Sequence, residues 1–304
     1  MRVVVLSGGV GGARMARGFD RLSEVDQTVI VNVGDDETTH GLHISPDLDT
    51  VIYTLAHKEG PHGWGRADDT FHANDELGRF GVNNKFKLGD RDLALKIFRT
   101  ERLQTGESLS AITEQARAGF GISTRVLPAT DHRLRTQIKL PDQSWISFQE
   151  YFVHRRHTDE VTDLRFAGSD QAAPAAGVLE SIVAADLLVI APSNPPLSIW
   201  PILAVEGIRD AVERHPATVA VSPLIGGKPV RGPADRVLAS LGLPAGNEGV
   251  LAAYQGLLQL LVIDETDAAD APGLAVEVLV ENTLIANPEA AARLARAVVE
   301  SPNS

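Results

Sequence analysis

Residues 3–14 read VVVLSGGVGGAR: an apolar run ends in a cluster of glycines and continues into a stretch that is compatible with a helix. This order predicts a buried parallel strand, a glycine-rich turn and then a helix. Glycine lets the backbone approach an anion closely, and the amides at the start of the helix then face that anion. We therefore expect this glycine cluster to bind a nucleotide or another phosphorylated ligand. A turn without a ligand is the alternative, because the spacing matches neither the usual dinucleotide fingerprint nor a Walker motif.

A second apolar run, residues 29–33, follows at the distance expected of one strand–helix–strand unit, and two acidic loops come after it. The first loop holds Asp35 and Asp36, and the second holds Asp47 and Asp49. Carboxylates at the carboxyl end of a parallel strand lie on the ligand side of such a sheet. They predict oxygen ligands for a hard divalent cation that also contacts phosphate. The alternative is a set of turn and cap residues, with Asp47 or Asp49 as a helix N-cap.

Composition narrows the class of protein. The chain has 304 residues with a formal net charge of −12, which argues against general binding of nucleic acid. It contains no cysteine, so disulfides, thiolate nucleophiles and cysteine-bound metals are excluded. We see no signal peptide and no apolar stretch long enough for a membrane span, and we expect a cytoplasmic protein without a membrane partner.

The remaining chain continues the α/β rhythm. Apolar strands are expected at 186–191 and 218–222, and the loops that follow them should emerge on the same edge as the glycine turn. Residues 136–140 and 145–151 predict a hairpin. We interpret residues 1–304 as a single domain with a Rossmann-like three-layer α/β fold and a mostly parallel sheet, in which residues from about 57 to 165 form an inserted smaller subdomain.

Several basic side chains could bind an anion, and we favour Lys87, Arg91 and Lys228 over solvated surface roles. The other members of this basic set are Arg14, Lys85 and Arg231. Ser7 and Ser193 are expected to be hydrogen-bond donors beside ligand loops rather than nucleophiles. His40 and His43 could touch a ligand or have ordinary structural roles. The residues alone thus predict an α/β protein that binds a phosphorylated nucleotide with the help of Mg²⁺, and the reaction stays open.

A series of segments, taken in order, resembles the 2-phospho-L-lactate transferase family of coenzyme F-420 biosynthesis, in its bacterial branch. The segments are SGGVGGAR at 7–14, VNVGDD at 31–36, SPDLDT at 45–50, GWG at 63–65, LGDRD at 88–92, FQE at 148–150, APSNP at 191–195 and SPLIGGKP at 222–229.

The resemblance implies a transfer that depends on Mg²⁺. The donor would be a guanosine diphosphate ester of a three-carbon acid, and the acceptor the ribityl hydroxyl of the deazaflavin Fo. The products would be coenzyme F-420-0, or its dehydro form, and GMP. Whether the acid is lactyl, phosphoenolpyruvyl or glyceryl stays open, because such small differences depend on pocket shape. A homodimer is also implied.

Residue roles follow from the same resemblance. Asp35 and Asp47 would hold Mg²⁺, while Asp49 and Lys87 would contact Fo, with Asp49 as a possible base. Phosphate would lie against Gly9, Gly11 and Gly12. The ligand-binding set is completed by Asp90, Arg91, Ser193, Asn194, Ser222 and Lys228, of which Ser193, Asn194 and the loop 222–228 would hold the guanosine diphosphate.

Two other functions are weighed against this one. A related branch of regulatory proteins shares the glycine turn and the paired aspartates and binds nucleotide sugars, but it resembles this chain mainly at its start. A dehydrogenase that binds NAD(P) is disfavoured by the irregular glycine spacing and the excess of aspartates.

Overall fold

The centre of the molecule is a seven-stranded sheet in the order β14-β13-β10-β9-β1-β2-β5, and every neighbouring pair in it is parallel. The coordinates are a computed structural model that describes residues 1–82 and 86–301. The strands are β1 (Arg2–Ser7), β2 (Asp26–Val31), β5 (Arg125–Pro128), β9 (Leu187–Ile190), β10 (Thr218–Val221), β13 (Leu260–Asp264) and β14 (Glu277–Glu281). The predicted α/β class is therefore confirmed.

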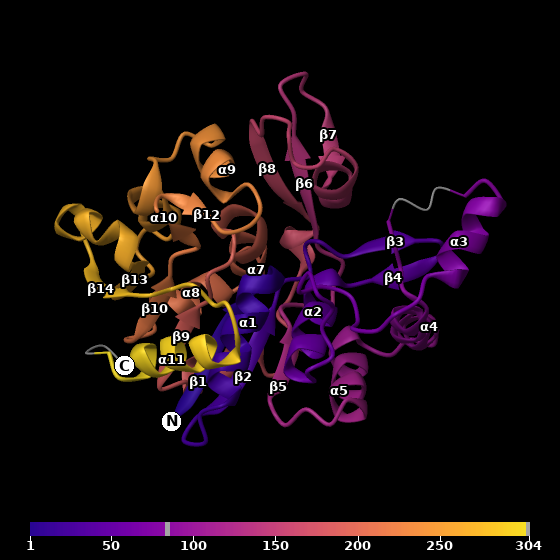
Figure 1. The fold of residues 1–304 in the computed structure, drawn as a ribbon, viewed down its shortest axis with the longest axis horizontal. Helices are drawn as coiled ribbons and strands as arrows, with labels where there is room; N and C mark the ends of the chain where they lie inside the picture. Colours follow the sequence, from indigo (N-terminus) through magenta and orange to yellow (C-terminus); the bar gives the residue numbers. More distant parts are fainter. Residues whose placement is uncertain (83–85, 302–304) are drawn as a thin grey trace.

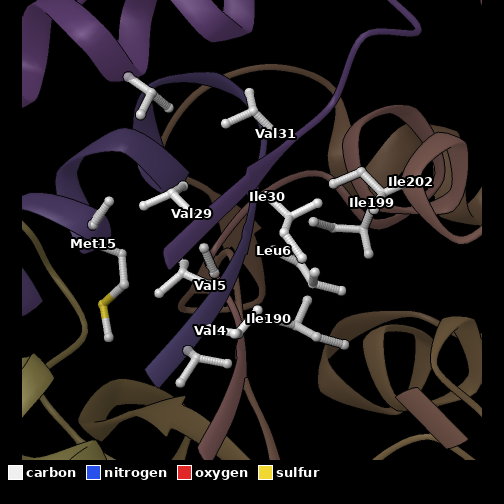
Figure 2. Packing of buried hydrophobic residues seen from close by; sticks show 14 of the residues in the cluster. Val4, Val5, Leu6, Met15, Val29, Ile30, Val31, Ile190, Ile199 and Ile202 are labelled. Atoms are coloured by element: carbon white, nitrogen blue, oxygen red, sulfur yellow. The ribbon is translucent and has the colours of Figure 1, made fainter. Parts of the chain in front are cut away.

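Sequence alternation explains why this sheet is covered on both faces. In β1, Val5 points to the side of Met15 of α1 (Gly9–Asp20), whereas Leu6 points to the side of Ile199 and Ile202 (Figure 2). All of these side chains are fully buried. Because successive side chains of a strand point to opposite faces, an uninterrupted apolar run needs a helical layer on each side.

Helices supply those two layers (Figure 1). α1 packs against α2 (Pro46–Leu55) and α11 (Pro288–Val299) on one face. The opposite face is covered by helices that flank β9 in the sequence, among them α6 (Val178–Ala184), α7 (Trp200–Leu203) and α8 (Ile208–Glu213). In the described part of the chain, no helix has both the length and the apolar character that crossing a membrane demands.

Five further α-helices lie in the described residues. They are α3 (His72–Arg79), α4 (Asp90–Gln104), α5 (Leu109–Gly119), α9 (Ala234–Ser240) and α10 (Gly246–Ala253), with single-turn or irregular helical segments at Glu150–His154, Ser169–Gln171, Pro195–Ile199 and Glu265–Gly273.

Small antiparallel sheets project beyond the main one. The predicted hairpin is confirmed as β6 (Arg135–Lys139) and β7 (Trp145–Ser147), and β6 also pairs with β8 (Asp163–Ala167), a strand that we did not expect. Two hairpins lie in loops: β3 (Glu37–Thr39) with β4 (Leu42–Ile44), and β11 (Leu224–Ile225) with β12 (Lys228–Pro229). In Figure 1 the sheet of β6, β7 and β8 stands apart from the main sheet.

The segment predicted as an inserted subdomain, about 57–165, is not confined to one side of the fold. It contains β5, which pairs in parallel with β2 at the edge of the main sheet. The bounds of that subdomain stay a prediction.

Candidate functional site

The carboxyl ends of the central strands surround a cavity of about 630 Å³. Its wall includes the turns after β1, β2, β9 and β10, and also residues 283–285, which follow β14. In the sheet, β2 lies next to β1 on one side and β9 lies next to β1 on the other, so the order of the strands changes direction at β1. A sheet of this kind binds ligands at the point where the strand order changes direction. The cavity lies at that point.

The glycine turn forms one wall of the cavity. Helix α1 begins at Gly9, whose φ of +65° would be strained for a residue with a side chain. The N-cap residue of α1 is Gly8, so no side chain caps the start of the helix. A Cβ on Gly11 would lie 2.3 Å from the carbonyl oxygen of Pro192, so only glycine lets α1 approach the turn after β9 this closely. Gly9 and Gly11 line the cavity, whereas Gly12 is not part of its wall and packs against Ser7 and Ser193.

Asp35 and Asp47 form a pair of buried carboxylates beside this turn. Asp47 accepts hydrogen bonds from the backbone N–H of Gly9 (2.8 Å) and from Nδ2 of Asn32 (3.0 Å). Burial raises its pKa to about 6. Burial, and then the charge of Asp47, raises the pKa of Asp35 well above its usual range. Negative charge on this pair is therefore poorly compensated by the protein itself.

These two carboxylates fit a divalent cation. The Oδ1 atom of Asp35 is buried and has no hydrogen-bond partner among the described residues. A cation would supply the missing partner and offset the repulsion that raises the two pKa values. Within residues 1–82 and 86–301, no three His, Asp or Glu side chains converge as a metal cluster. Mg²⁺ does not require one, because it commonly takes one or two carboxylates together with phosphate oxygens and water.

Asp49, two residues further along α2, has the opposite environment. It forms buried ion pairs with Arg99, through both guanidinium Nη atoms, and with Lys96 (2.8 Å). These cations outweigh burial and lower the pKa of Asp49. Lys96 also pairs with Asp92, which in turn accepts a hydrogen bond from the hydroxyl of Tyr53 (2.6 Å). We name these five residues the α4 ion cluster: Tyr53, Asp49, Asp92, Lys96 and Arg99.

His43 has a structural contact rather than a place in the cavity wall. Its Nε2 lies 2.8 Å from Oδ2 of the buried Asp36, and the same oxygen accepts a hydrogen bond from the Ser45 hydroxyl (2.8 Å). These bonds tie the two acidic loops together. His40 lies in the tight turn between β3 and β4 with a φ of +53°.

Ser193, Asn194 and Ser222 line the cavity, but their side-chain oxygens also brace the loops that carry them. The hydroxyl of Ser193 donates to the carbonyl of Gly8 (2.7 Å), and Oδ1 of Asn194 accepts from the N–H of Leu197 (3.2 Å). The hydroxyl of Ser222 lies 2.6 Å from Oδ1 of the buried Asn247 and donates to it. The loops predicted to hold the guanosine diphosphate are therefore held in shape by hydrogen bonds within the protein.

The predicted basic set divides in two. Arg14, Lys87 and Arg231 line the cavity. Arg91 and Lys228 are exposed and are not part of its wall, and Lys85 lies outside the described residues. Asp90 is also turned elsewhere: its carboxylate accepts from the Thr70 hydroxyl and from the first backbone N–H groups of α3.

Sequence reasoning missed the cations of the α4 ion cluster. Asp92, Lys96 and Arg99 are spaced by four and then three residues, which places them on one face of a helix, and this spacing was a readable signal. It also missed residues 283–285, which reach the cavity only through the fold and carry no local signal.

Comparisons with known proteins identify the family of the chain. A family model described as 2-phospho-L-lactate transferase CofD matches residues 3–295. The chain is 45% identical over 276 residues to a phosphoenolpyruvate transferase of Streptomyces griseus subsp. griseus, covering 88% of this chain and 87% of the relative. It is 42% identical over 312 residues to a phosphoenolpyruvate transferase of Kitasatospora aureofaciens, covering 97% and 96%.

Among solved structures, a member of the UPF0052 family from Bacillus halodurans superposes with a TM-score of 0.66 over 98% of this chain and 99% of that one. Its sequence identity is 17%, so this likeness supports the fold alone. The family resemblance identified from the sequence is confirmed by the family model and by the two transferases. The chain belongs to the 2-phospho-L-lactate transferase family.

Proposed function

We propose that this transferase moves a phosphorylated three-carbon acid from its guanosine diphosphate ester to the deazaflavin Fo, and releases GMP. The observation that carries the proposal is the pair Asp35 and Asp47, buried and uncompensated, next to a glycine turn at the switch point of the sheet. The relatives are named phosphoenolpyruvate transferases, which favours a phosphoenolpyruvyl donor over a lactyl or glyceryl one.

Asp35 and Asp47 would hold a Mg²⁺ ion in this reaction. When bound, the ion supplies positive charge to the diphosphate, and such neutralisation is worth several kcal/mol in phosphoryl transfer. Asn32 and the N–H of Gly9 hold Asp47 in place for this role. Gly9 and Gly11 let the donor phosphates approach the start of α1, where the helix dipole favours negative charge.

The transfer step forms one bond and breaks one. The terminal hydroxyl oxygen of Fo attacks the phosphorus that carries the three-carbon acid. The bond from that phosphorus to the oxygen bridging to the guanosine phosphate breaks, GMP leaves with the electron pair, and the proton of the attacking hydroxyl passes to water. Because the chemistry needs in-line placement more than covalent catalysis, the residues contribute mainly by positioning.

Asp49 and Lys87 line the same cavity, and we assign the part around them to Fo. The lowered pKa of Asp49 keeps it ionised, so it can accept a hydrogen bond from the attacking hydroxyl and orient it. The same lowered pKa makes it a weak base, and we therefore favour positioning by Asp49 over removal of the proton. The contacts predicted for Ser193, Asn194 and Ser222 with the guanosine diphosphate are part of this proposal.

The two alternatives are less well supported. The family model covers nearly the whole chain, and the transferases match at 42% to 45% identity, so a regulatory sugar-nucleotide binder is not favoured. The glycine spacing still disfavours an NAD(P) enzyme. The homodimer and the cytoplasmic location stay predictions.

Mass spectrometry of the reaction product tests the proposal. The protein is incubated with Fo, Mg²⁺ and an equal mixture of the lactyl, phosphoenolpyruvyl and glyceryl guanosine diphosphate esters. We expect GMP and a phosphodiester of Fo, with the phosphoenolpyruvyl product in excess. Formation of no phosphodiester from any of the three donors would refute the function.

A further inference from the structure

Two arginines face the cavity and have no carboxylate partner among residues 1–82 and 86–301. Arg14 comes from α1, and Arg231 comes from the turn that follows β12. Neither forms an ion pair within the part of the chain that the structure describes, whereas Lys96 is paired with both Asp49 and Asp92. The positive charge of these two arginines is therefore available to a ligand.

Neutral groups hold both guanidinium groups in place. Nη1 of Arg14 donates to the carbonyl of Ile285 at 3.0 Å. Arg231 donates to the carbonyl of His62, and its guanidinium carbon lies 5.6 Å from the centre of the Trp64 ring. Carbonyl groups and an aromatic ring orient an arginine without cancelling its charge.

The two charges also act on each other. Burial, followed by the charges of Arg231 and Arg17, lowers the pKa of Arg14. The charge of Glu59 acts in the opposite direction, but Glu59 is ion-paired with Arg17. An anion bound between Arg14 and Arg231 would relieve this repulsion.

The proposed donor carries two kinds of anion, a diphosphate and a carboxylate. The glycine turn and the cation that Asp35 and Asp47 would hold are proposed to bind the diphosphate. The carboxylate has no such cation, and the acidic side chains of the same cavity would repel it. A planar guanidinium matches a carboxylate through paired N–H donors.

We propose that Arg14 and Arg231 bind the carboxylate of the three-carbon acid and make the enzyme specific for donors that carry one. This inference rests on the proposed function and deepens it. It assigns recognition of the acid class to the two arginines, since lactyl, phosphoenolpyruvyl and glyceryl donors all present the same carboxylate. Discrimination among those three acids then belongs to other parts of the wall.

Calorimetric binding in the presence of Mg²⁺ and without Fo tests this assignment. Three ligands are compared: GDP, the lactyl guanosine diphosphate ester, and the same ester with its carboxylate converted to a neutral amide. The variants are Arg14→Gln and Arg231→Gln, with Arg214→Gln as the matched control because Arg214 is an exposed surface residue on the end of α8. Circular dichroism checks that each variant is folded.

We expect the wild-type protein and Arg214→Gln to bind the acid more tightly than the amide by about 10- to 100-fold, as for loss of a charge-assisted hydrogen bond. Each cavity variant should lose most of that preference and keep its affinity for GDP within about twofold. Arg231→Lys should retain an intermediate preference, because charge is kept and the paired donors are lost.

Two results would overturn this inference and leave the proposed function intact. One is an undiminished preference for the acid in both variants, and the other is an equal loss of affinity for GDP and for the ester. The second result would assign the arginines to the diphosphate. A wild-type protein that binds neither GDP nor the ester would instead refute the proposed function, and the inference with it.

Discussion

Two pairs of carboxylates in one cavity have opposite electrostatic environments. Asp35 and Asp47 have raised pKa values and form no ion pair with the residues that the structure describes, whereas Asp49 and Asp92 are paired with the cations of α4. Both pairs are buried, so burial alone does not decide their charge. What decides it is whether the protein itself supplies the positive charge. The first pair needs a bound cation to compensate its charge, whereas the charge of the second pair is compensated by cations of the protein.

The largest effect is expected from Asp47→Asn. Loss of a carboxylate from the proposed cation pair should reduce the transfer rate on the order of a thousandfold or more, since several kcal/mol of charge stabilisation are lost. The fold should persist, because the amide removes charge repulsion and keeps the shape of the side chain. Steady-state kinetics and circular dichroism measure the two properties. Asp210→Asn, on the exposed surface of α8, is the control. A folded variant with the wild-type rate would contradict the cation assignment.

Substitutions in the α4 ion cluster should lower the stability of the protein. Arg99→Met leaves the buried Asp49 with less compensation, which costs about 3–5 kcal/mol for a broken buried ion pair. Chemical denaturation measures this loss. Asp35→Asn should not lower the stability of the metal-free protein, because it removes a buried charge that forms no ion pair among residues 1–82 and 86–301. If both variants lost stability equally, the contrast between the two pairs would be wrong.

The pH dependence of stability separates the pairs further. The folded-state pKa of Asp47 is raised from 3.8 to about 6. The contribution of Asp47 to the free energy of unfolding is therefore fully present below pH 3.8 and is lost as the pH rises through about 6. That shift corresponds to about 3 kcal/mol. The difference in unfolding free energy between the metal-free wild type and Asp47→Asn should therefore change in this window, and Mg²⁺ should offset the loss above it. Asp49, with a lowered pKa, loses its contribution only in stronger acid. A difference that is flat from roughly pH 4 to pH 7 would argue against a raised pKa for Asp47.

The smallest effect is expected outside the cavity. Asp90 belongs to the predicted ligand set, but its carboxylate is engaged at the start of α3. Asp90→Asn should change the KM for donor and for Fo by less than about twofold. A tenfold rise in either KM would return Asp90 to the binding site.

The sequence predicted the parts of the site that lie next to their own signals. The glycine turn and the loops with Asp35, Asp47 and Asp49 follow apolar strands directly, and parallel strands bring such loops to one edge. Asp90 and Asp92 could not be told apart in this way, because a separation of two residues on a helix turns a side chain by about 200°, to another face of the helix. The contribution of residues 283–285 depends on the pairing of β13 with β14, which no local pattern specifies.

A crystal structure of the protein with GDP and Mg²⁺ tests the central claim most directly. We expect one metal ion bound between the carboxylates of Asp35 and Asp47, in contact with the diphosphate, and none at Asp49. A nucleotide bound away from the glycine turn, or an ion at Asp49 with none at Asp35 and Asp47, would contradict the claim.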